Sequence, residues 1–217
     1  MDGLLLETEV LWDRAEGELF RRHGDEWTFE DKLAVMGTSV EATARYYAER
    51  LDQPIERGRE LVIEMHELMK LELERQVDAR PGAVELVARL RDLGTVRVGL
   101  ASNSSREIVD IALRAAGLTD AFEAIVTSDD VEHAKPGPDI YLLACERLDV
   151  APSEAVALED TTTGIAAAKA AGLYTIAVPQ FAETDVSAAD RVMESLEELL
   201  DVPPLISPGG GNGEAGA

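Results

Sequence analysis

The fold is decided by a stretch at residues 155–164, Ala155-Val156-Ala157-Leu158-Glu159-Asp160-Thr161-Thr162-Thr163-Gly164. Its first four residues are continuously apolar, which is typical of a short strand covered on both faces. The strand is expected to end at two adjacent carboxylates. A helix of small residues should then run from Gly164 to Ala171 and end at Gly172. A buried strand followed at once by a helix favours a parallel α/β sheet.

The same alternation of helix and strand extends to both sides of this stretch. Upstream we expect helices at 84–93, 104–116 and 138–148 and strands at 96–101 and 124–127. Downstream we expect strands at 175–178 and 191–193 and a helix at 196–200. This order predicts a doubly wound parallel sheet. Residues 207–217 contain five glycines, and we expect them to be disordered.

Residues 10–78 have no strand pattern and predict four helices instead. Thr8, Thr28 and Ser39 are candidate N-caps, and Pro54 suits the first turn of the last helix. The predicted architecture is therefore an α/β core, residues 1–9 and 79–206, with an all-α insertion at residues 10–78.

Composition excludes several classes of function. The chain has 43 acidic and 20 basic residues and a net charge of -23, which disfavours binding to nucleic acid or to an anionic membrane. A small anionic substrate remains compatible if local cations and N–H groups gather it. Cys145 is the only cysteine, so no internal disulfide can form, and its apolar helical context predicts a buried residue. We expect a cytoplasmic monomer, because no leader or long apolar run is present.

Two polar stretches follow expected strands and could bind ligands. Glu159 and Asp160 would repel each other unless a cation lay near them, and hard oxygen ligands suit Mg²⁺. Alternatively, Asp160 or a threonine caps the next helix. Ser102-Asn103-Ser104 offers hydroxyls, an amide and N–H groups for an anion, or it is a plain helix cap.

Lys135 and Asp2 are the other candidate site residues. Lys135 lies before Pro136 and Pro138, which restrict its backbone, but a solvated surface lysine would have the same sequence. Asp2 could act as a general acid or base, or it could lie in a frayed terminus. Ligands of open α/β sheets bind at the carboxyl ends of strands, so these polar stretches are predicted to converge there.

Four ordered motifs together carry a family resemblance. They are Met-Asp-Gly-Leu-Leu-Leu-Glu-Thr-Glu at 1–9, Ala-Ser-Asn-Ser at 101–104, Ala-Lys-Pro-Gly-Pro-Asp-Ile-Tyr at 134–141 and Leu-Glu-Asp-Thr-Thr-Thr-Gly-Ile-Ala-Ala-Ala-Lys-Ala-Ala-Gly at 158–172. The chain resembles the haloacid dehalogenase superfamily, in the subgroup of β-phosphoglucomutases and sugar-phosphate phosphatases. The resemblance implies a Rossmann-like core, and it makes residues 10–78 a helical cap whose closure would exclude water and select substrate.

The resemblance also implies catalytic roles. The family forms an aspartyl-phosphate on the first Asp of an Asp-x-Asp-Gly loop. Asp2 matches the second Asp, which is the general acid/base and ligates Mg²⁺ through its carbonyl. Lys135 would offset negative charge, Asp160 would ligate Mg²⁺, and Glu159 would support that ion indirectly.

Three further residues would contact the substrate side of this site. By the same likeness, Ser102 and Asn103 would hold the transferring phosphoryl group. Thr8 would begin the hinge into the cap and could touch substrate. The implied partner is a small phosphorylated metabolite.

One position departs from the family pattern. Met1 occupies the middle of Asp-x-Asp, so the nucleophile position falls immediately before Met1, as does the strand that carries it. We expect the native protein to begin about six to twelve residues upstream. Residues 1–217 alone should then be poorly stable and nearly inactive. If Met1 is the native start, the alternative is a non-catalytic phosphate-binding remnant.

The helical insertion favours one subgroup. Trp12 stands where mutases place a His, and Val40 stands where they place an Arg that binds a distal phosphate. Leu-Trp-Asp-Arg-Ala at 11–15 is similar to hexitol- or deoxyglucose-phosphate phosphatases. The expected function is a Mg²⁺-dependent phosphatase of sugar or polyol phosphates, with a β-phosphoglucomutase-like phosphotransferase as the alternative.

Overall fold

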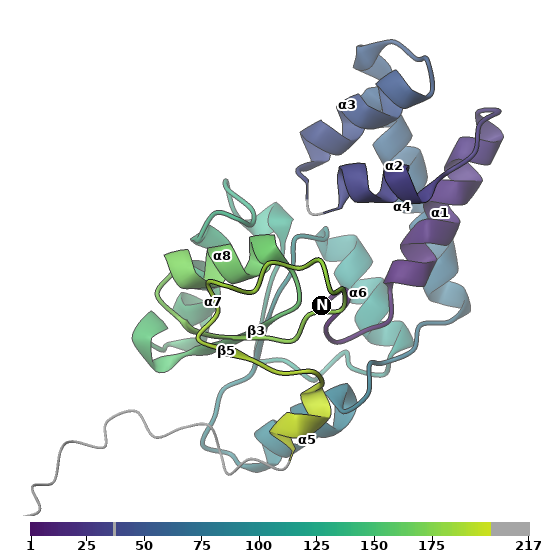
Figure 1. Cartoon of the computed structure of the whole chain (residues 1–217). Coiled ribbons are helices and arrows are strands. Elements are labelled where there is room, and N and C mark those ends of the chain that lie inside the picture. The colour runs from purple at the N-terminus through teal and green to yellow at the C-terminus, as the bar shows by residue number, and fades with distance from the viewer. Residues whose placement is uncertain (37, 201–217) are drawn as a thin grey trace, which may run out of the picture.

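The computed structural model of the chain describes residues 1–36 and 38–200. A group of four helices, α1 to α4, lies to one side of the part that contains the strands (Figure 1). These helices are α1 (Glu9–Arg22), α2 (Phe29–Val35), α3 (Val40–Arg50) and α4 (Gly58–Arg75), with a 3-10 turn, η1 (Ile55–Arg57), before α4. The described residues between 9 and 75 contain no strand, as the sequence predicts.

Two of the three predicted caps of these helices are present. The Thr28 hydroxyl accepts from the Asp31 N–H while Asp31 accepts from the Thr28 N–H, a reciprocal capping box. Ser39 accepts from the N–H of Ala42. The cap predicted for Thr8 is wrong, because Thr8 already has helical φ and ψ (−88° and −16°) and its side chain caps nothing. A cap residue normally has extended backbone angles, from which its side chain can reach the first N–H groups.

The helical part has an aromatic core. Phe20 of α1 and Tyr47 of α3 are fully buried. The ring of Phe20 meets that of Trp27 edge to face, with centroids 4.9 Å apart. Edge-to-face contact is favourable for aromatic pairs, so this cluster joins α1, α3 and the turn between α1 and α2.

The remaining elements alternate between strand and helix. The strands are β1 (Gly99–Ala101), β2 (Ala124–Val126), β3 (Val156–Glu159), β4 (Tyr174–Ala177) and β5 (Arg191–Val192), and the helices are α5 (Ala83–Asp92), α6 (Arg106–Ala115), α7 (Asp139–Leu148) and α8 (Thr162–Ala170), with short 3-10 turns η2 (Ser128–Asp130), η3 (Pro152–Glu154) and η4 (Leu196–Leu199). All strand pairs are parallel, which confirms an α/β arrangement.

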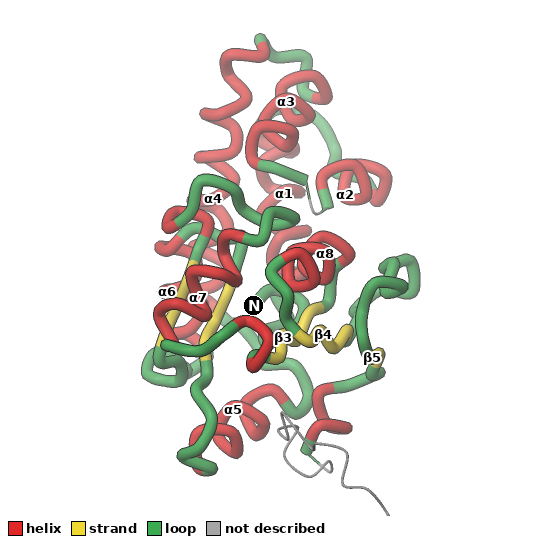
Figure 2. Tube along the Cα trace, turned by 90° about the vertical axis from the view of Figure 1, so that its left-hand side faces the viewer, coloured by secondary structure: helices red, strands yellow, loops and turns green. Residues whose placement is uncertain are grey.

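The expected single sheet is wrong for the described residues, which form two sheets. One has the order β1-β2 and the other β3-β4-β5. The amino terminus is seen between the two sheets in Figure 2. Residues 1–6 bond mainly to one another, since Leu5 and Leu6 both donate to the Met1 carbonyl and Gly3 donates to the Leu6 carbonyl. The segment is therefore a tight turn, and it supplies no strand to connect β1 with β3.

Two short segments connect the helical part to the strand-containing part. Residues 5–7 run antiparallel to residues 78–80, with hydrogen bonds from Glu7 N–H to the Asp78 carbonyl and from Arg80 N–H to the Leu5 carbonyl. The Arg80 guanidinium also pairs with the Glu7 carboxylate at 3.0 Å. Both crossings are thereby held side by side.

Several element boundaries differ from the sequence prediction. Helix α8 begins at Thr162, two residues early, because the Thr161 hydroxyl accepts from Gly164 N–H and caps it. Glu159 is the last residue of β3. The helix expected at 196–200 is the 3-10 turn η4, and the expected strand at 96–101 is reduced to β1. The segment 207–217, predicted to be disordered, lies outside the described residues.

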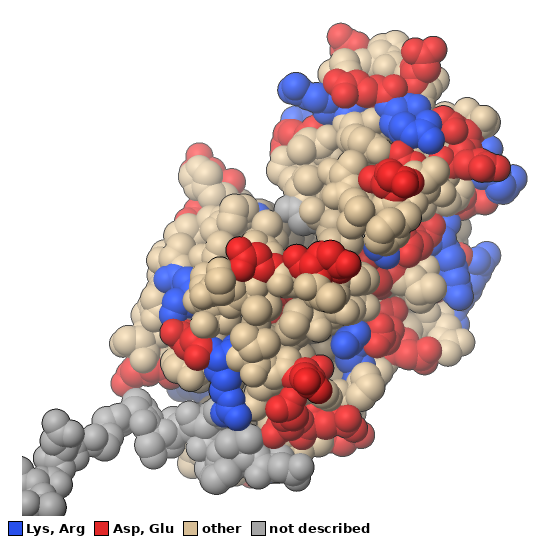
Figure 3. Space-filling view, in the orientation of Figure 1, with Lys and Arg blue, Asp and Glu red and all other residues tan. Residues whose placement is uncertain are grey.

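Burial and surface charge agree with the composition. Cys145 is buried, as predicted. On the face in Figure 3, acidic side chains cover parts of both regions, and basic ones lie singly or in small groups among them. Among the described residues, no helix has the length and apolarity needed to cross a membrane.

Candidate active site

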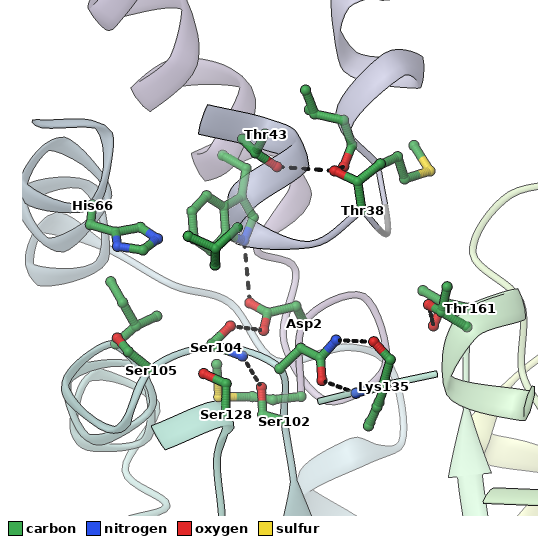
Figure 4. A pocket seen from close by; sticks show the side chains of 18 of the residues that line it. Asp2, Thr38, Thr43, His66, Ser102, Ser104, Ser105, Ser128, Lys135 and Thr161 are labelled. Atoms are coloured by element: carbon green, nitrogen blue, oxygen red, sulfur yellow. Dashed lines mark hydrogen bonds between the residues drawn. The ribbon is translucent and has the colours of Figure 1, made fainter. Parts of the chain in front are cut away.

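One cavity of about 530 Å³ lies between the carboxyl ends of the strands and the helical part. Six of the seven predicted site residues line it: Asp2, Ser102, Asn103, Lys135, Glu159 and Asp160. Figure 4 shows Asp2 and Lys135 on the strand side of this cavity, facing Thr38 and Thr43 of the helical side. The convergence expected at the strand ends is therefore present.

Lys135 joins the two sheets through its side chain. Its side chain is 9% exposed, and its Nζ donates to the Ala101 carbonyl at 3.1 Å and to Glu159 Oε1 at 2.5 Å. It therefore connects the ends of β1 and β3. The alternative of a solvated surface lysine does not describe this environment. Its ammonium faces a cavity of an acidic protein, where it can neutralise an anion.

Glu159 is buried and has two hydrogen-bond donors on one carboxylate oxygen. It accepts hydrogen bonds from Lys135 and from the Tyr141 hydroxyl. Burial alone would raise the pKa of Glu159, but the Lys135 charge and these hydrogen bonds hold it below its usual value. Gly164 of α8 lies directly against the Glu159 carboxylate, and a Cβ there would collide with it. The carboxylate is thus ionised and fixed in position.

The surroundings of Asp160 raise its pKa, whereas those of Glu159 lower the pKa of that residue. Its carboxylate is buried, forms no ion pair within the described part of the chain, and lies against Gly3 with no space for a Cβ. Burial, and next the charge of Glu159, raise the pKa of Asp160 to about 7. A nearby cation would relieve this cost of ionisation.

The donors near Asp160 fit a cation that needs few protein ligands. Within residues 1–36 and 38–200, no group of three or more His, Cys, Asp or Glu side chains could hold a metal by itself. Mg²⁺ keeps several waters and commonly takes one or two carboxylates plus substrate phosphate oxygens. The Asp160 carboxylate and the Asp2 backbone carbonyl are donors of this hard-oxygen type, so the chain's residues are compatible with Mg²⁺.

Asn103 and Ser102 shape the loop that follows β1. The Asn103 amide forms two hydrogen bonds with the backbone of Lys135, one to its carbonyl and one from its N–H. The Ser102 hydroxyl is buried and accepts from Ser104 N–H at 3.2 Å. Asn103 therefore positions Lys135, while the Ser102 hydroxyl proton remains available to an acceptor in the cavity.

The helix after this loop begins later than predicted. Helix α6 starts at Arg106, and Ser105 precedes it without a side-chain cap. The Arg106 N–H donates to Asp129. This first N–H of the helix is therefore used within the protein.

Asp2 is held by hydrogen bonds from both sides of the cavity. The Ser104 hydroxyl donates to its Oδ2 at 2.9 Å, and the Trp12 indole donates to its Oδ1 at 3.3 Å. Met1 is also buried. A frayed terminus, the alternative interpretation of Asp2, is thus excluded. The contact with Trp12 links the carboxylate to α1 and hence to the helical part.

Thr8 is the one predicted site residue outside the cavity. It is completely buried at the start of α1, and its hydroxyl has no hydrogen-bond partner among the described residues. In this conformation its side chain cannot touch a ligand. Its position next to the paired connecting segments is consistent with the predicted start of a hinge.

Other residues, which the sequence patterns did not predict, line the cavity from the helical side. They include a polar stripe on α1, residues Glu9, Trp12, Asp13 and Glu16, together with Lys32, Thr38, Thr43 and His66. The stripe follows the spacing i, i+3, i+4, i+7, so it occupies one helix face. A polar helix face that points into the protein indicates a cavity. The sequence does not show which face of α1 points inward, so the pattern alone could not reveal these residues.

Fold and site together define a hydrolase. The family model for haloacid dehalogenase-like hydrolases matches residues 1–172, and the chain belongs to this family. It is similar to YhcW of Bacillus subtilis, with 39% identity over 82% of this chain and 80% of the relative. It is also similar to hexitol phosphatase B of Escherichia coli K12, with 34% identity over 92% of this chain and 91% of the relative.

Solved structures support the same assignment. CbbY of Rhodobacter sphaeroides in complex with phosphate superposes with a TM-score of 0.79 and 32% identity, covering 92% of this chain and 93% of that one. A mutant of CbbY was solved with xylulose-(1,5)bisphosphate and has the same TM-score at 31% identity, covering 92% of this chain and 93% of that one. The fold of the chain is therefore the α/β fold of this family, within the subgroup of CbbY, hexitol phosphatase and β-phosphoglucomutase.

Proposed function

We propose that the protein is a Mg²⁺-dependent phosphatase of small phosphorylated metabolites, with sugar or polyol phosphates as substrates. The observation that carries the proposal is the position of Lys135. Its ammonium joins the ends of β1 and β3 in a cavity that Ser102, Asp2 and Asp160 also line. The similarity to hexitol phosphatase B supports the substrate class.

In the proposed reaction, a carboxylate nucleophile attacks phosphorus and forms an aspartyl-phosphate, which water then hydrolyses. The Ser102 hydroxyl and Lys135 bind the phosphoryl oxygens and offset their charge. Asp2 donates a proton to the leaving hydroxyl and later takes one from water. Asp160 would hold Mg²⁺, with Glu159 supporting the site, and the ion would supply electrostatic stabilisation of the phosphoryl oxygens.

In the family's Asp-x-Asp pattern, the nucleophile of this proposal falls one position before Met1. Asp2 aligns with the second carboxylate of the Asp-x-Asp motif, and Met1 with its middle position. Met1 lines the cavity, and the charge of its amino group acts on Asp160 and Glu159. A residue attached there would enter the same site. Mass spectrometry of the natural amino terminus tests this assignment, and a mature chain that begins at Met1 would rule it out.

The helical residues 10–78 serve in this proposal as a cap that opens for substrate and closes for chemistry. The paired segments 5–7 and 78–80 are short enough to act as a double hinge. The Trp12 indole of this cap already donates to Asp2, so α1 contacts the proposed acid/base directly.

Phosphate release tests the function. Protein with its natural amino terminus is incubated with a panel of sugar and polyol monophosphates, with Mg²⁺ or with EDTA. We expect Mg²⁺-dependent release of inorganic phosphate. Incubation with β-glucose 1-phosphate and a bisphosphate primer separates the alternative, because a phosphotransferase of the β-phosphoglucomutase type would produce an isomer instead of free phosphate.

A further inference from the structure

The helical side of the cavity has an acidic wall, which we define as Glu9, Asp13 and Glu16 of α1. All three line the cavity. Seven residues separate the first from the last, which corresponds to two helical turns or about 10 Å along the axis. The wall therefore extends away from Asp2 and Lys135 over the length of a small sugar phosphate.

Lys32 is the only Lys or Arg that lines the cavity from the described helical residues. Its Nζ lies 2.7 Å from Asp13 Oδ2 and 3.2 Å from Glu9 Oε2, and its side chain is 13% exposed. Both neighbours are carboxylates of the acidic wall, so its charge is already compensated. His66 also lines the cavity, but burial lowers the pKa of its ring and favours the neutral form. Among the described residues, this end of the cavity therefore has no uncompensated cation for a second phosphate.

Uncharged hydrogen-bonding groups are nevertheless present at this end. The hydroxyls of Thr38 and Thr43 lie 3.0 Å apart and point toward each other on the side opposite Asp2 (Figure 4). The Tyr47 hydroxyl donates to Glu16 Oε1 at 2.7 Å, which leaves the second oxygen of that carboxyl without a partner in the described chain. Burial raises the pKa of Glu16 to about 8, so near neutral pH this carboxyl is uncharged, and its oxygens and the threonine hydroxyls can bond alcohol groups.

We infer, building on the proposed phosphatase function, that the acidic wall selects monophosphates with an uncharged, hydroxyl-bearing body and rejects substrates with a second phosphate. A second phosphate would face the carboxylates of Glu9 and Asp13, which share one counter-ion, Lys32, and like charges repel each other. Hydroxyl groups at the same place gain charge-assisted hydrogen bonds. This selectivity would separate the chain from its structural relative CbbY, which was solved with a bisphosphate.

Binding measurements test this selectivity without requiring turnover. Isothermal titration calorimetry with Mg²⁺ compares fructose 6-phosphate with fructose 1,6-bisphosphate, two ligands that share one body. We expect the monophosphate to bind at least about tenfold more tightly, because of like-charge repulsion. Equal or tighter binding of the bisphosphate, or binding of neither ligand, would overturn the inference.

Two variants test whether the charges of the wall cause this preference, because they should change it in opposite directions. Asp13→Asn removes one partner of Lys32 and should reduce the ratio of bisphosphate to monophosphate dissociation constants by about tenfold. Lys32→Met should increase this ratio. Asp92→Asn, the same chemical change on α5 outside the cavity, should leave the ratio unchanged. A ratio that does not respond to Asp13→Asn would contradict a role for the wall. Hydrolysis of p-nitrophenyl phosphate, which has an uncharged body, reports the phosphatase function separately and can fail while the binding ratio holds.

Discussion

Lys135 has two consequences at the residue scale, one for activity and one for stability. Replacing it by Met removes a charge from the phosphoryl site and should lower kcat/KM about 10²- to 10³-fold, as loss of one stabilising donor does. It also leaves Glu159 buried without its cation, which should cost about 3 kcal/mol in the free energy of unfolding. Phosphate release and urea unfolding measure the two effects. Lys169→Met is the control, at a lysine paired with Asp190 outside the site. It should leave both kcat/KM and the free energy of unfolding nearly unchanged.

Glu16 makes stability depend on pH. Burial, and next the charges of Asp13 and Glu9, raise the pKa of Glu16 to about 8 from 4.5, against the hydrogen bond from Tyr47. Between these values the unfolded chain has lost a proton that the folded chain keeps, so stability falls as pH rises.

Glu16→Gln should therefore raise the free energy of unfolding at pH 8 by on the order of 4 kcal/mol and have little effect at pH 4.5. Urea unfolding across this range measures the difference. In Glu16→Gln the free energy of unfolding should still fall somewhat as pH rises, because the pKa of Asp160 is raised as well. An equal effect of the substitution at both pH values would show that Glu16 is ionised in the folded protein.

The residue types of the site could be predicted from sequence, but their partners could not. Glu159 and Asp160 are recognisable because they follow an apolar run, and Lys135 because it precedes Pro136 and Pro138. The contact of Trp12 with Asp2 and the burial of Lys135 depend on elements that are distant in sequence. No local pattern encodes such contacts, and for the same reason the acidic wall was missed.

At the scale of elements, two glycines give opposite predictions. Gly164→Ala places a Cβ against the Glu159 carboxylate and should destabilise the protein by about 2 kcal/mol, as overpacking of a buried site does. Gly17 lies inside α1 with nothing within 4 Å of an added Cβ, so Gly17→Ala should stabilise it by about 0.5–1 kcal/mol through helix propensity. Thermal unfolding of both variants checks the signs. Destabilisation by both would mean that α1 is packed on that face.

Element type was predictable and element ends less so. Alternating apolar runs and glycines located the helices and strands of the α/β part. The start of α8 was misplaced because Thr161, not a residue nearer Gly164, caps it. The single sheet was overpredicted because strand patterns do not show which edges pair, and residues 1–6 satisfy their hydrogen bonds in a turn.

At the scale of the whole molecule, ligand binding should stabilise the fold. If Asp160 holds Mg²⁺, saturation at 100 times the dissociation constant adds about 2.7 kcal/mol to the free energy of unfolding. Thermal unfolding with and without MgCl₂ should show this gain, and Asp160→Asn should abolish it. Asp185→Asn, in an exposed loop, should retain it. A gain that persists in Asp160→Asn would place the ion elsewhere.

The helical part and the strand ends together form the cavity, and the central claim is that this cavity is a phosphatase site. The most direct test of this claim is phosphate release by the protein with its natural amino terminus. Sorbitol 6-phosphate is the substrate, with Mg²⁺ present or chelated by EDTA. We predict release of inorganic phosphate that EDTA stops and that Lys135→Met lowers about 10²-fold or more. Absence of Mg²⁺-dependent release from this and from every other sugar or polyol monophosphate tested would contradict a phosphatase site at the ends of β1 and β3.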